Sequence, residues 1–340
     1  MYPQQFLTTP RLTTAYYRAG EEGRPKLLLL HGNISSSDFF LPLFPALAER
    51  FDVAAPDLRC FGDSSALPID ATRTYRDWSD DVAEFVAALG WDRFVLGGWS
   101  MGGCVAMQYA IDHGEQLDGL LLINPGSPFG FGGSKDVEGT VLEPAGLASG
   151  GGCVNPQLVQ ALIGGDREFV RVAMNNSNFT PGFRLEPAWE QRLIDGRMKT
   201  RVGEGMYPGD SRKSTRWPYV VSGDKGVCNT MSPAHGNLAG LADIPAKPPV
   251  LWVRGAADVM VSDTSSGDFG FLGQCGIVPG WPGAEVIPPQ PMVAQTRYVL
   301  DRYAANGGTY QERVLPGGHG CFLENADDFV AAVTELFAGA

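Results

Sequence analysis

Short apolar segments alternate with amphipathic segments along the first third of the chain, and this alternation limits the possible folds more than any other feature. Lys26–Leu30 and Phe51–Ala55 are short, mostly apolar runs typical of buried strands. Trp78–Leu89 and Met101–His113 carry apolar residues at helical spacing and end at glycines. Strands without polar alternation, separated by helices, indicate a parallel sheet that is covered on both faces. We therefore expect the α/β class, with a doubly wound and mostly parallel sheet.

The alternation stops after Pro125 and resumes only at a predicted strand over 249–254. The intervening stretch holds glycine clusters and short helical pieces, but its aromatic and aliphatic content argues against a disordered linker. We therefore predict a core in two parts, 1–125 and 248–340, separated by a cap or lid insertion at 126–247. A second insertion, rich in glycine and proline, is expected at about 262–291. The remaining predicted elements are helices at 39–50, 157–163, 168–174, 186–197, 292–306 and 326–338, and strands at 93–97, 117–124 and 309–315.

The net charge limits the kinds of binding partner, and the cysteines indicate the redox state of the cellular compartment. The formal charge of −12 disfavours binding to nucleic acid or to an anionic membrane surface. No apolar run approaches the ~20 residues of a membrane span, and the first twenty residues do not have the pattern of a secretory signal. We expect a cytoplasmic protein that acts on a small molecule, and the sequence is compatible with a homodimer. The six cysteines are expected to be free thiols, because they are far apart and show no metal-ligand spacing: Cys60, Cys104, Cys153, Cys228, Cys275 and Cys321.

Ser100 is the candidate nucleophile. It stands in Gly98-Trp99-Ser100-Met101-Gly102-Gly103, which fits the pattern G-x-S-x-G between a predicted strand and a predicted helix. Glycines permit the sharp strand-to-helix turn that raises a serine oxygen above the sheet. The start of the helix also favours negative charge developing nearby. The alternative is a structural serine in a turn.

Candidates for the acid and the base follow Ser100 along the chain, in the order Ser, Asp, His that accompanies such a turn. His319 lies just after the last predicted strand, where its ring can project over the carboxyl edge of the sheet. Asp258 follows the strand at 249–254 and can accept a hydrogen bond from the histidine Nδ1–H. Asp263 and Asp268 are nearby alternatives for the acid.

An oxyanion hole is expected from two backbone N–H groups, those of Asn33 and Met101. Asn33 belongs to His31-Gly32-Asn33, which ends the first predicted strand, and Met101 begins the helix after Ser100. The other histidines are expected outside the chemistry, with His31 structural, His113 at a helix end and His235 in a surface loop. No cofactor and no metal site is expected.

With these motifs the chain resembles the α/β-hydrolase family over roughly residues 12–125 and 248–338, while the insertion at 126–247 carries no such resemblance. Cys60 departs from the family pattern, because family members usually have glycine there; it either alters the pocket mouth or is inert. The resemblance makes haloalkane dehalogenase and epoxide hydrolase activities improbable, since those members carry aspartate at the nucleophile position. The residues that carry the resemblance are His31-Gly32-Asn33, Asp57-Leu58-Arg59-Cys60-Phe61-Gly62-Asp63-Ser64, the Ser100 turn, Asp258 and His319.

The resemblance and the serine together imply acyl chemistry. We expect a carboxylesterase or lactonase that works through an acyl-enzyme and a Ser-His-Asp triad. The same triad is compatible with a C–C bond hydrolase or an acyltransferase, and the fold is also used by ligand-binding proteins without turnover. The motifs contain no group of basic residues that could bind a phosphorylated substrate, so a medium-sized, largely apolar substrate is predicted. Aromatic residues available to line its pocket, or to pack the insertions together, are Phe129, Phe131, Phe179, Phe183, Trp189, Trp217, Tyr219, Phe269, Phe271 and Trp281.

Overall fold

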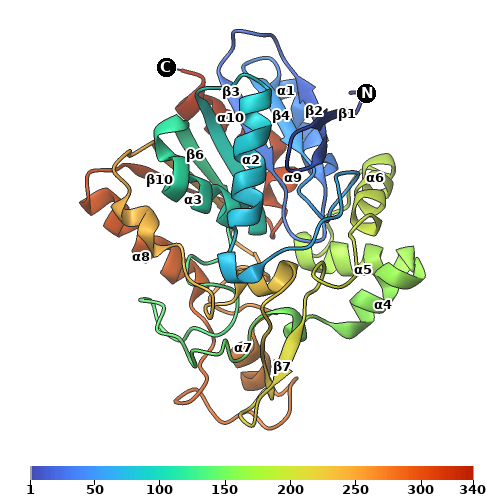
Figure 1. Cartoon of the computed structure of the whole chain (residues 1–340), viewed down its shortest axis with the longest axis vertical. Helices are drawn as coiled ribbons and strands as arrows, with labels where there is room; N and C mark the ends of the chain where they lie inside the picture. The colour runs from blue at the N-terminus through green and yellow to red at the C-terminus, as the bar shows by residue number, and fades with distance from the viewer. Residues whose placement is uncertain (1, 340) are drawn as a thin grey trace.

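A single eight-stranded sheet organises the molecule (Figure 1). The computed structural model describes residues 2–339. The sheet order is β1-β2-β4-β3-β5-β6-β9-β10, and the last six strands of this order run parallel, while β1 and β2 pair antiparallel at one edge. This confirms the predicted doubly wound, mostly parallel α/β class. The strands are β1 (Gln5–Thr8), β2 (Thr13–Ala19), β3 (Lys26–Leu30), β4 (Asp52–Pro56), β5 (Phe94–Trp99), β6 (Leu117–Ile123), β9 (Val250–Gly255) and β10 (Tyr310–Leu315).

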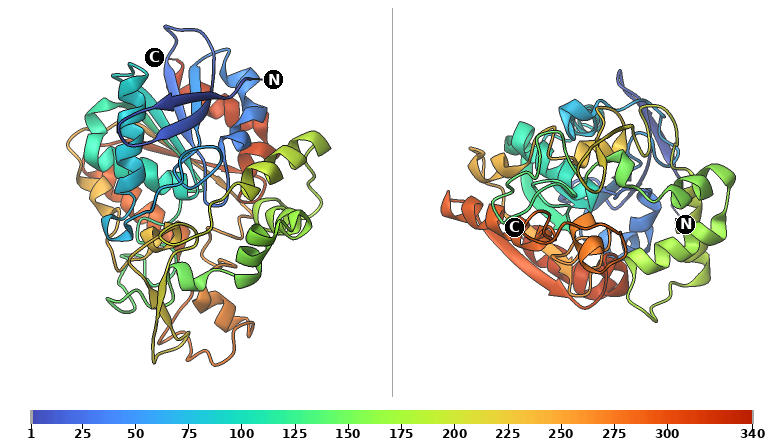
Figure 2. Two further views of the ribbon diagram at one scale, coloured as in Figure 1. Left: turned by 45° about the vertical axis from the view of Figure 1, so that its right-hand side comes forward. Right: turned by 90° about the horizontal axis from the view of Figure 1, so that it is seen from below.

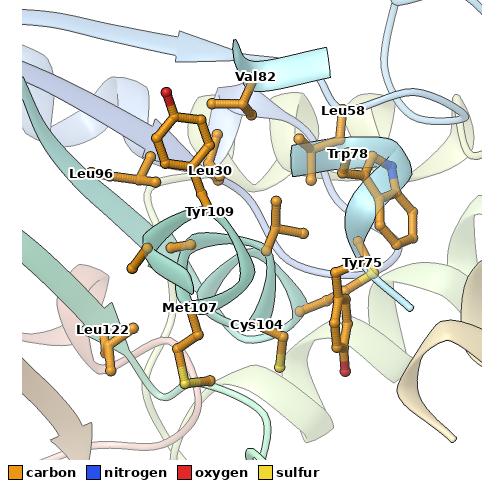
Figure 3. Close-up of a cluster of buried hydrophobic side chains, with 14 of the residues drawn as sticks. Leu30, Leu58, Tyr75, Trp78, Val82, Leu96, Cys104, Met107, Tyr109 and Leu122 are labelled. Carbon is orange, nitrogen blue, oxygen red and sulfur yellow. The ribbon is translucent and has the colours of Figure 1, made fainter. Parts of the chain in front are cut away.

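Helices cover both faces of the sheet, because successive strand residues point to opposite sides. In β3, Leu28 and Leu30 belong to one buried cluster and Leu27 and Leu29 to the other. The first cluster lies beneath α2, α3 and α8, and Figure 3 shows part of it. The second lies beneath α1, α9 and α10. These helices are α1 (Phe44–Leu47), α2 (Arg76–Ala88), α3 (Met101–His113), α8 (Met292–Ala305), α9 (Cys321–Glu324) and α10 (Ala326–Phe337).

Most predicted elements are confirmed within a few residues, but the helix expected at 39–50 is wrong in form. The structure has a 3-10 helix, Ser37–Leu43, followed by the single turn of α1. Pro42 and Pro45 explain the difference, since proline lacks the N–H that a longer α-helix needs. The antiparallel strands β1 and β2 were not expected from the apolar pattern.

The two segments predicted as insertions meet at the lower end of the molecule in Figure 1, where β7 lies near α7, while α4, α5 and α6 run up one side of the core (Figures 1 and 2). They share a small apolar cluster that contains Leu147, Trp217 and Ile287, with Phe269 and Trp281 packed against it. Trp217 Nε1 also donates to the carbonyl oxygen of Pro279 at 2.8 Å. Several of the aromatic residues therefore join the insertions to each other. The elements are α4 (Pro156–Gly164), α5 (Arg167–Asn178), α6 (Pro187–Met198), β7 (Ser211–Lys213), β8 (Val220–Ser222) and α7 (Phe269–Gln274).

All six cysteines are free thiols, as expected, and Cys275 is exposed. Among residues 2–339, no helix combines the length and the hydropathy needed to cross a bilayer.

Candidate active site

Ser100 occupies a strained turn between β5 and α3. Its backbone has φ 56° and ψ −120°, a region that non-glycine residues rarely adopt. The neighbouring glycines make this turn possible: a Cβ on Gly98 would overlap the carbonyl oxygen of Gly102, and a Cβ on Gly102 would overlap that of Leu30. The Ser100 N–H donates to Ile123 O at 2.9 Å, which ties the turn to β6. The side chain is left partly exposed at the carboxyl edge of the parallel strands.

His319 and Asp258 are brought together at the same edge of the sheet. His319 follows β10, Asp258 follows β9, and these two strands are parallel neighbours. His319 Nδ1 lies 2.7 Å from Asp258 Oδ2, and both side chains are buried. Asp258 Oδ1 accepts from the backbone N–H groups of Met260 at 2.7 Å and Val261 at 3.0 Å. These bonds fix the carboxylate, so that Nδ1–H is the donor and His319 Nε2 is left as the basic nitrogen.

The alternative acids are engaged elsewhere. Asp263 Oδ1 accepts from Val293 N and Ala294 N at the start of α8. Asp268 is the N-cap of α7 and accepts from Phe271 N at 3.0 Å. Helix capping explains both residues, and Asp258 is the carboxylate that His319 contacts.

Two side chains that were not recognised from the sequence hold the backbone of His319. Trp99 Nε1 and Asn124 Nδ2 both donate to His319 O, each at 2.8 Å. Asn124 Oδ1 accepts from Gly255 N at 2.8 Å, so this one buried amide connects the ends of β6 and β9 to the histidine loop. A polar residue at the end of a buried strand, directly before Pro125, was the available signal in the sequence.

The two N–H groups predicted for an oxyanion hole lie beside Ser100. A Cβ added to Gly32 would be 3.0 Å from Ser100 Cβ, so the backbone before Asn33 passes directly over the serine turn. Within the described part of the chain, neither Asn33 N–H nor Met101 N–H donates to a protein acceptor. Ile34, the next residue, has φ 47°, a strained value for a β-branched residue, so the surrounding structure imposes this turn. Both donors are therefore free to bind a negatively charged oxygen.

The remaining histidines make structural contacts. His31 is fully buried, and its Nε2 accepts from Leu58 N at 2.9 Å. Burial lowers the pKa of His31 to about 4, so it is neutral at pH 7. His113 packs against Tyr109 at the end of α3, and His235 Nε2 lies 2.7 Å from Gly223 O in the large insertion.

Cys60 has φ 72°, which explains why glycine is usual at this position. Its thiol is buried and donates to Leu67 O at 2.9 Å, while its carbonyl oxygen accepts from Arg201 N at 2.8 Å. Burial raises the pKa of this thiol to about 12, so the group stays protonated. These contacts indicate that Cys60 packs the loop against the large insertion.

The large insertion also contacts the loop that carries the histidine. Gly320 N donates to Asn178 O at 2.6 Å, at the end of α5. The next residue, Phe179, packs so closely that a Cβ on Gly320 would lie 2.6 Å from its ring. The ring of Phe183 packs at a tilt against that of Phe179, with centroids 5.1 Å apart. Of the ten candidate lining residues, Phe179 thus lies against the loop that carries His319, with Phe183 beside it.

Comparisons with known proteins agree with this architecture. Residues 25–144 match the family described as alpha/beta hydrolase fold. Over 119 residues the chain is 36% identical to a probable 1-acylglycerol-3-phosphate O-acyltransferase of Oryza sativa subsp. japonica, covering 34% of this chain and 29% of that protein. Over 100 residues it is 39% identical to a pimeloyl-[acyl-carrier protein] methyl ester esterase of Aeromonas hydrophila subsp. hydrophila, covering 29% and 37%.

The solved structures show the same fold over the whole chain. A hydrolase from Pseudomonas aeruginosa PA01 has a TM-score of 0.63 at 21% identity, with 99% of this chain and 98% of that chain covered. The curated relatives are matched over only about a third of their length. The family match over residues 25–144 includes Asn33 and Ser100 and ends before Asp258 and His319.

Proposed function

We propose that the chain, whose residues 25–144 match the alpha/beta hydrolase fold family, is a serine hydrolase that cleaves a carboxylic ester or lactone through an acyl-enzyme. One observation carries the proposal: Ser100 in its strained turn and the bonded pair of Asp258 and His319 stand at the same edge of the sheet. A relative that is 39% identical over 100 residues is named as a methyl ester esterase, which supports ester cleavage.

In the proposed mechanism, Ser100 Oγ attacks the carbonyl carbon while His319 Nε2 takes the serine proton. Asp258 keeps Nδ1 protonated and stabilises the imidazolium that forms. The N–H groups of Asn33 and Met101 bind the oxyanion, and each such donor contributes roughly 3–4 kcal/mol to the transition state.

Collapse of the tetrahedral intermediate breaks the bond to the leaving alcohol, which receives the proton from His319. A water molecule then attacks the acyl-enzyme while His319 takes one of its protons. The acid product leaves and the serine hydroxyl is restored. Trp99 and Asn124 act on the backbone of His319 and position it for both proton transfers.

The test is turnover of p-nitrophenyl butyrate by purified variants. Ser100→Ala and His319→Ala should each lower kcat by at least about 10⁴-fold while the unfolding temperature stays close to that of the wild type. Ser266→Ala and His113→Ala are matched controls, because one changes an exposed serine and the other a histidine at a helix end. Substantial turnover by folded Ser100→Ala would exclude the proposed nucleophile.

Acyl transfer is the second candidate, and the relative named as an acyltransferase favours it. It differs only in the acceptor that attacks the acyl-enzyme. Adding an alcohol acceptor such as glycerol during turnover separates the two, because a transferase forms a glyceryl ester whereas a hydrolase releases only the acid.

A further inference from the structure

Arg197, in the last turn of α6, is a buried cation for which residues 2–339 provide no ion-pair or hydrogen-bond partner. It is 5% exposed, and its Nε has no hydrogen-bond acceptor. Its guanidinium forms no ion pair with any carboxylate of residues 2–339, and Tyr207 is the one ionisable group that raises its pKa. Burial lowers the pKa of Arg197 to about 10, so the group is still charged at pH 7. An unpaired buried charge of this kind is costly, which points to a partner from outside the chain.

Two neighbouring basic residues of the same segment are paired, and Arg201, which has no ion pair among residues 2–339, is exposed to solvent, so Arg197 differs from them in being both buried and unpaired. Arg192 Nε donates to Asp38 at 2.8 Å. Lys199 Nζ forms an ion pair with Asp63. Both pairs are partly exposed, whereas Arg197 is enclosed.

Arg197 is connected to the candidate active site through a series of ring contacts. Its Cζ lies 5.6 Å from the ring centroid of Phe39. Phe39 stacks on Trp99 with centroids 5.0 Å apart, and Trp99 lies 5.3 Å from the ring of His319. Trp99 directly precedes Ser100, so the rings of Phe39 and Trp99 connect the guanidinium to the serine turn.

A second set of contacts runs from Arg197 toward Asn33. Arg197 and Cys228 both act on the pKa of the buried Tyr207 side chain, and the Cys228 sulfur accepts from Asn33 Nδ2 at 3.6 Å. Thr200 Oγ1, three residues after Arg197, is a second buried polar atom without a partner. A charged donor and a hydroxyl are thus left without protein partners, among the described residues, in a segment whose contacts lead both to Trp99 and to Asn33.

We propose that Arg197 binds a carboxylate of the substrate, so that the enzyme acts on an ester or lactone whose acyl part carries a free carboxylate. A guanidinium pairs with a carboxylate through two parallel N–H···O bonds. A single positive charge among Phe39 and Tyr207 matches one negative charge, whereas a phosphate dianion would call for a second cation. This inference rests on the proposed function and revises the largely apolar substrate expected from the motifs, which do not include Arg197.

The first test compares two esters of similar length, mono-p-nitrophenyl glutarate and p-nitrophenyl valerate. In Arg197→Met, the ratio of kcat/KM for the charged ester to that for the neutral ester should fall about 10- to 100-fold, the loss expected for a hydrogen bond to a charged group. Lys199→Met is the matched control, because it removes a cation that already has a partner, and should leave the ratio unchanged. An unchanged ratio in Arg197→Met would overturn the inference.

The second test measures binding without catalysis. Calorimetry compares the binding of glutarate to Ser100→Ala and to the double variant that also carries Arg197→Met. The single variant should bind glutarate about 10- to 100-fold more tightly than the double variant. Glutaramide, which lacks the charge, should bind both equally. If glutarate binds through Arg197 but the wild type hydrolyses neither ester, the proposed function fails and the carboxylate site stands. Equal affinity of glutarate for both variants would refute the site.

Folding of the variant is checked by its unfolding temperature, which should equal or exceed that of the wild type because an unpaired buried charge is removed. Should Arg197→Met not fold, inhibition of the wild type decides. Glutarate should then compete with the charged ester and glutaramide should not; equal inhibition by both would overturn the inference.

Discussion

Asp258→Asn tests the arrangement of the acid and the base most sharply, because the surrounding structure fixes how the new amide must lie. Asp258 Oδ1 faces two backbone donors, Met260 N at 2.7 Å and Val261 N at 3.0 Å. The amide oxygen must take this position, since an NH₂ group there would face two N–H groups. The amide NH₂ is then placed 2.7 Å from His319 Nδ1.

Two donors cannot face each other, so His319 must move its proton from Nδ1 to Nε2. An Nε2–H group cannot accept the proton of Ser100. Loss of the correct tautomer by this substitution costs about 10⁴-fold in kcat in a serine protease, which corresponds to about 5.5 kcal/mol of transition-state stabilisation. We expect a loss of the same order here, with little change in folding stability, since the side-chain volume and both backbone hydrogen bonds are retained.

The assay is steady-state turnover of p-nitrophenyl butyrate, with unfolding followed by circular dichroism. Asp263→Asn is the matched control, because Asp263 caps α8 and does not contact His319. It should keep kcat within about threefold of the wild type, as expected for a change outside the triad. If folded Asp258→Asn retained more than a tenth of kcat, the proposed role of the carboxylate would be wrong.

Three further outcomes are expected. Burial lowers the pKa of His31 to about 4, so the unfolded chain binds a proton at this residue before the folded protein does as the pH falls. The free energy of unfolding of the wild type, measured in urea relative to that of His31→Gln, should therefore fall by about 3 kcal/mol between pH 7 and pH 4. Gly102→Ala should destabilise the protein by about 1–3 kcal/mol or more, because the new Cβ would overlap the carbonyl oxygens of Leu30 and His31; a melting curve equal to the wild type would contradict this. Ellman's reagent should titrate one fast thiol in the native protein and none in Cys275→Ser, since Cys275 is the exposed cysteine.

The sheet and the serine turn could be predicted from the sequence, because both depend on local patterns. The apolar runs predict the parallel strands, and glycines at 98 and 102 mark the turn at Ser100. The helix expected at 39–50 was wrong, because the apolar spacing was weighed without Pro42 and Pro45. The spacing of apolar residues therefore predicts a helix well only where no proline removes a backbone N–H that the helix needs.

The remainder of the site depends on contacts between distant parts of the chain. Three aspartates followed the same strand, and only their hydrogen bonds distinguish Asp258 from the two helix caps. Asn124 acts on a residue 195 positions away. Arg197 lies within a predicted helix, but the pattern of polar residues in that helix does not indicate which side of it is buried. The sequence also gives no sign that this arginine lacks an ion-pair partner.

Covalent labelling of Ser100 by a fluorophosphonate tests the central claim most directly. The proposed mechanism predicts one adduct per folded chain, mapped to Ser100 by peptide mass spectrometry. It also predicts no adduct in Ser100→Ala, and slow labelling in His319→Ala because the base is lost. Equal labelling of folded Ser100→Ala, or no adduct on the folded wild type, would contradict a serine nucleophile.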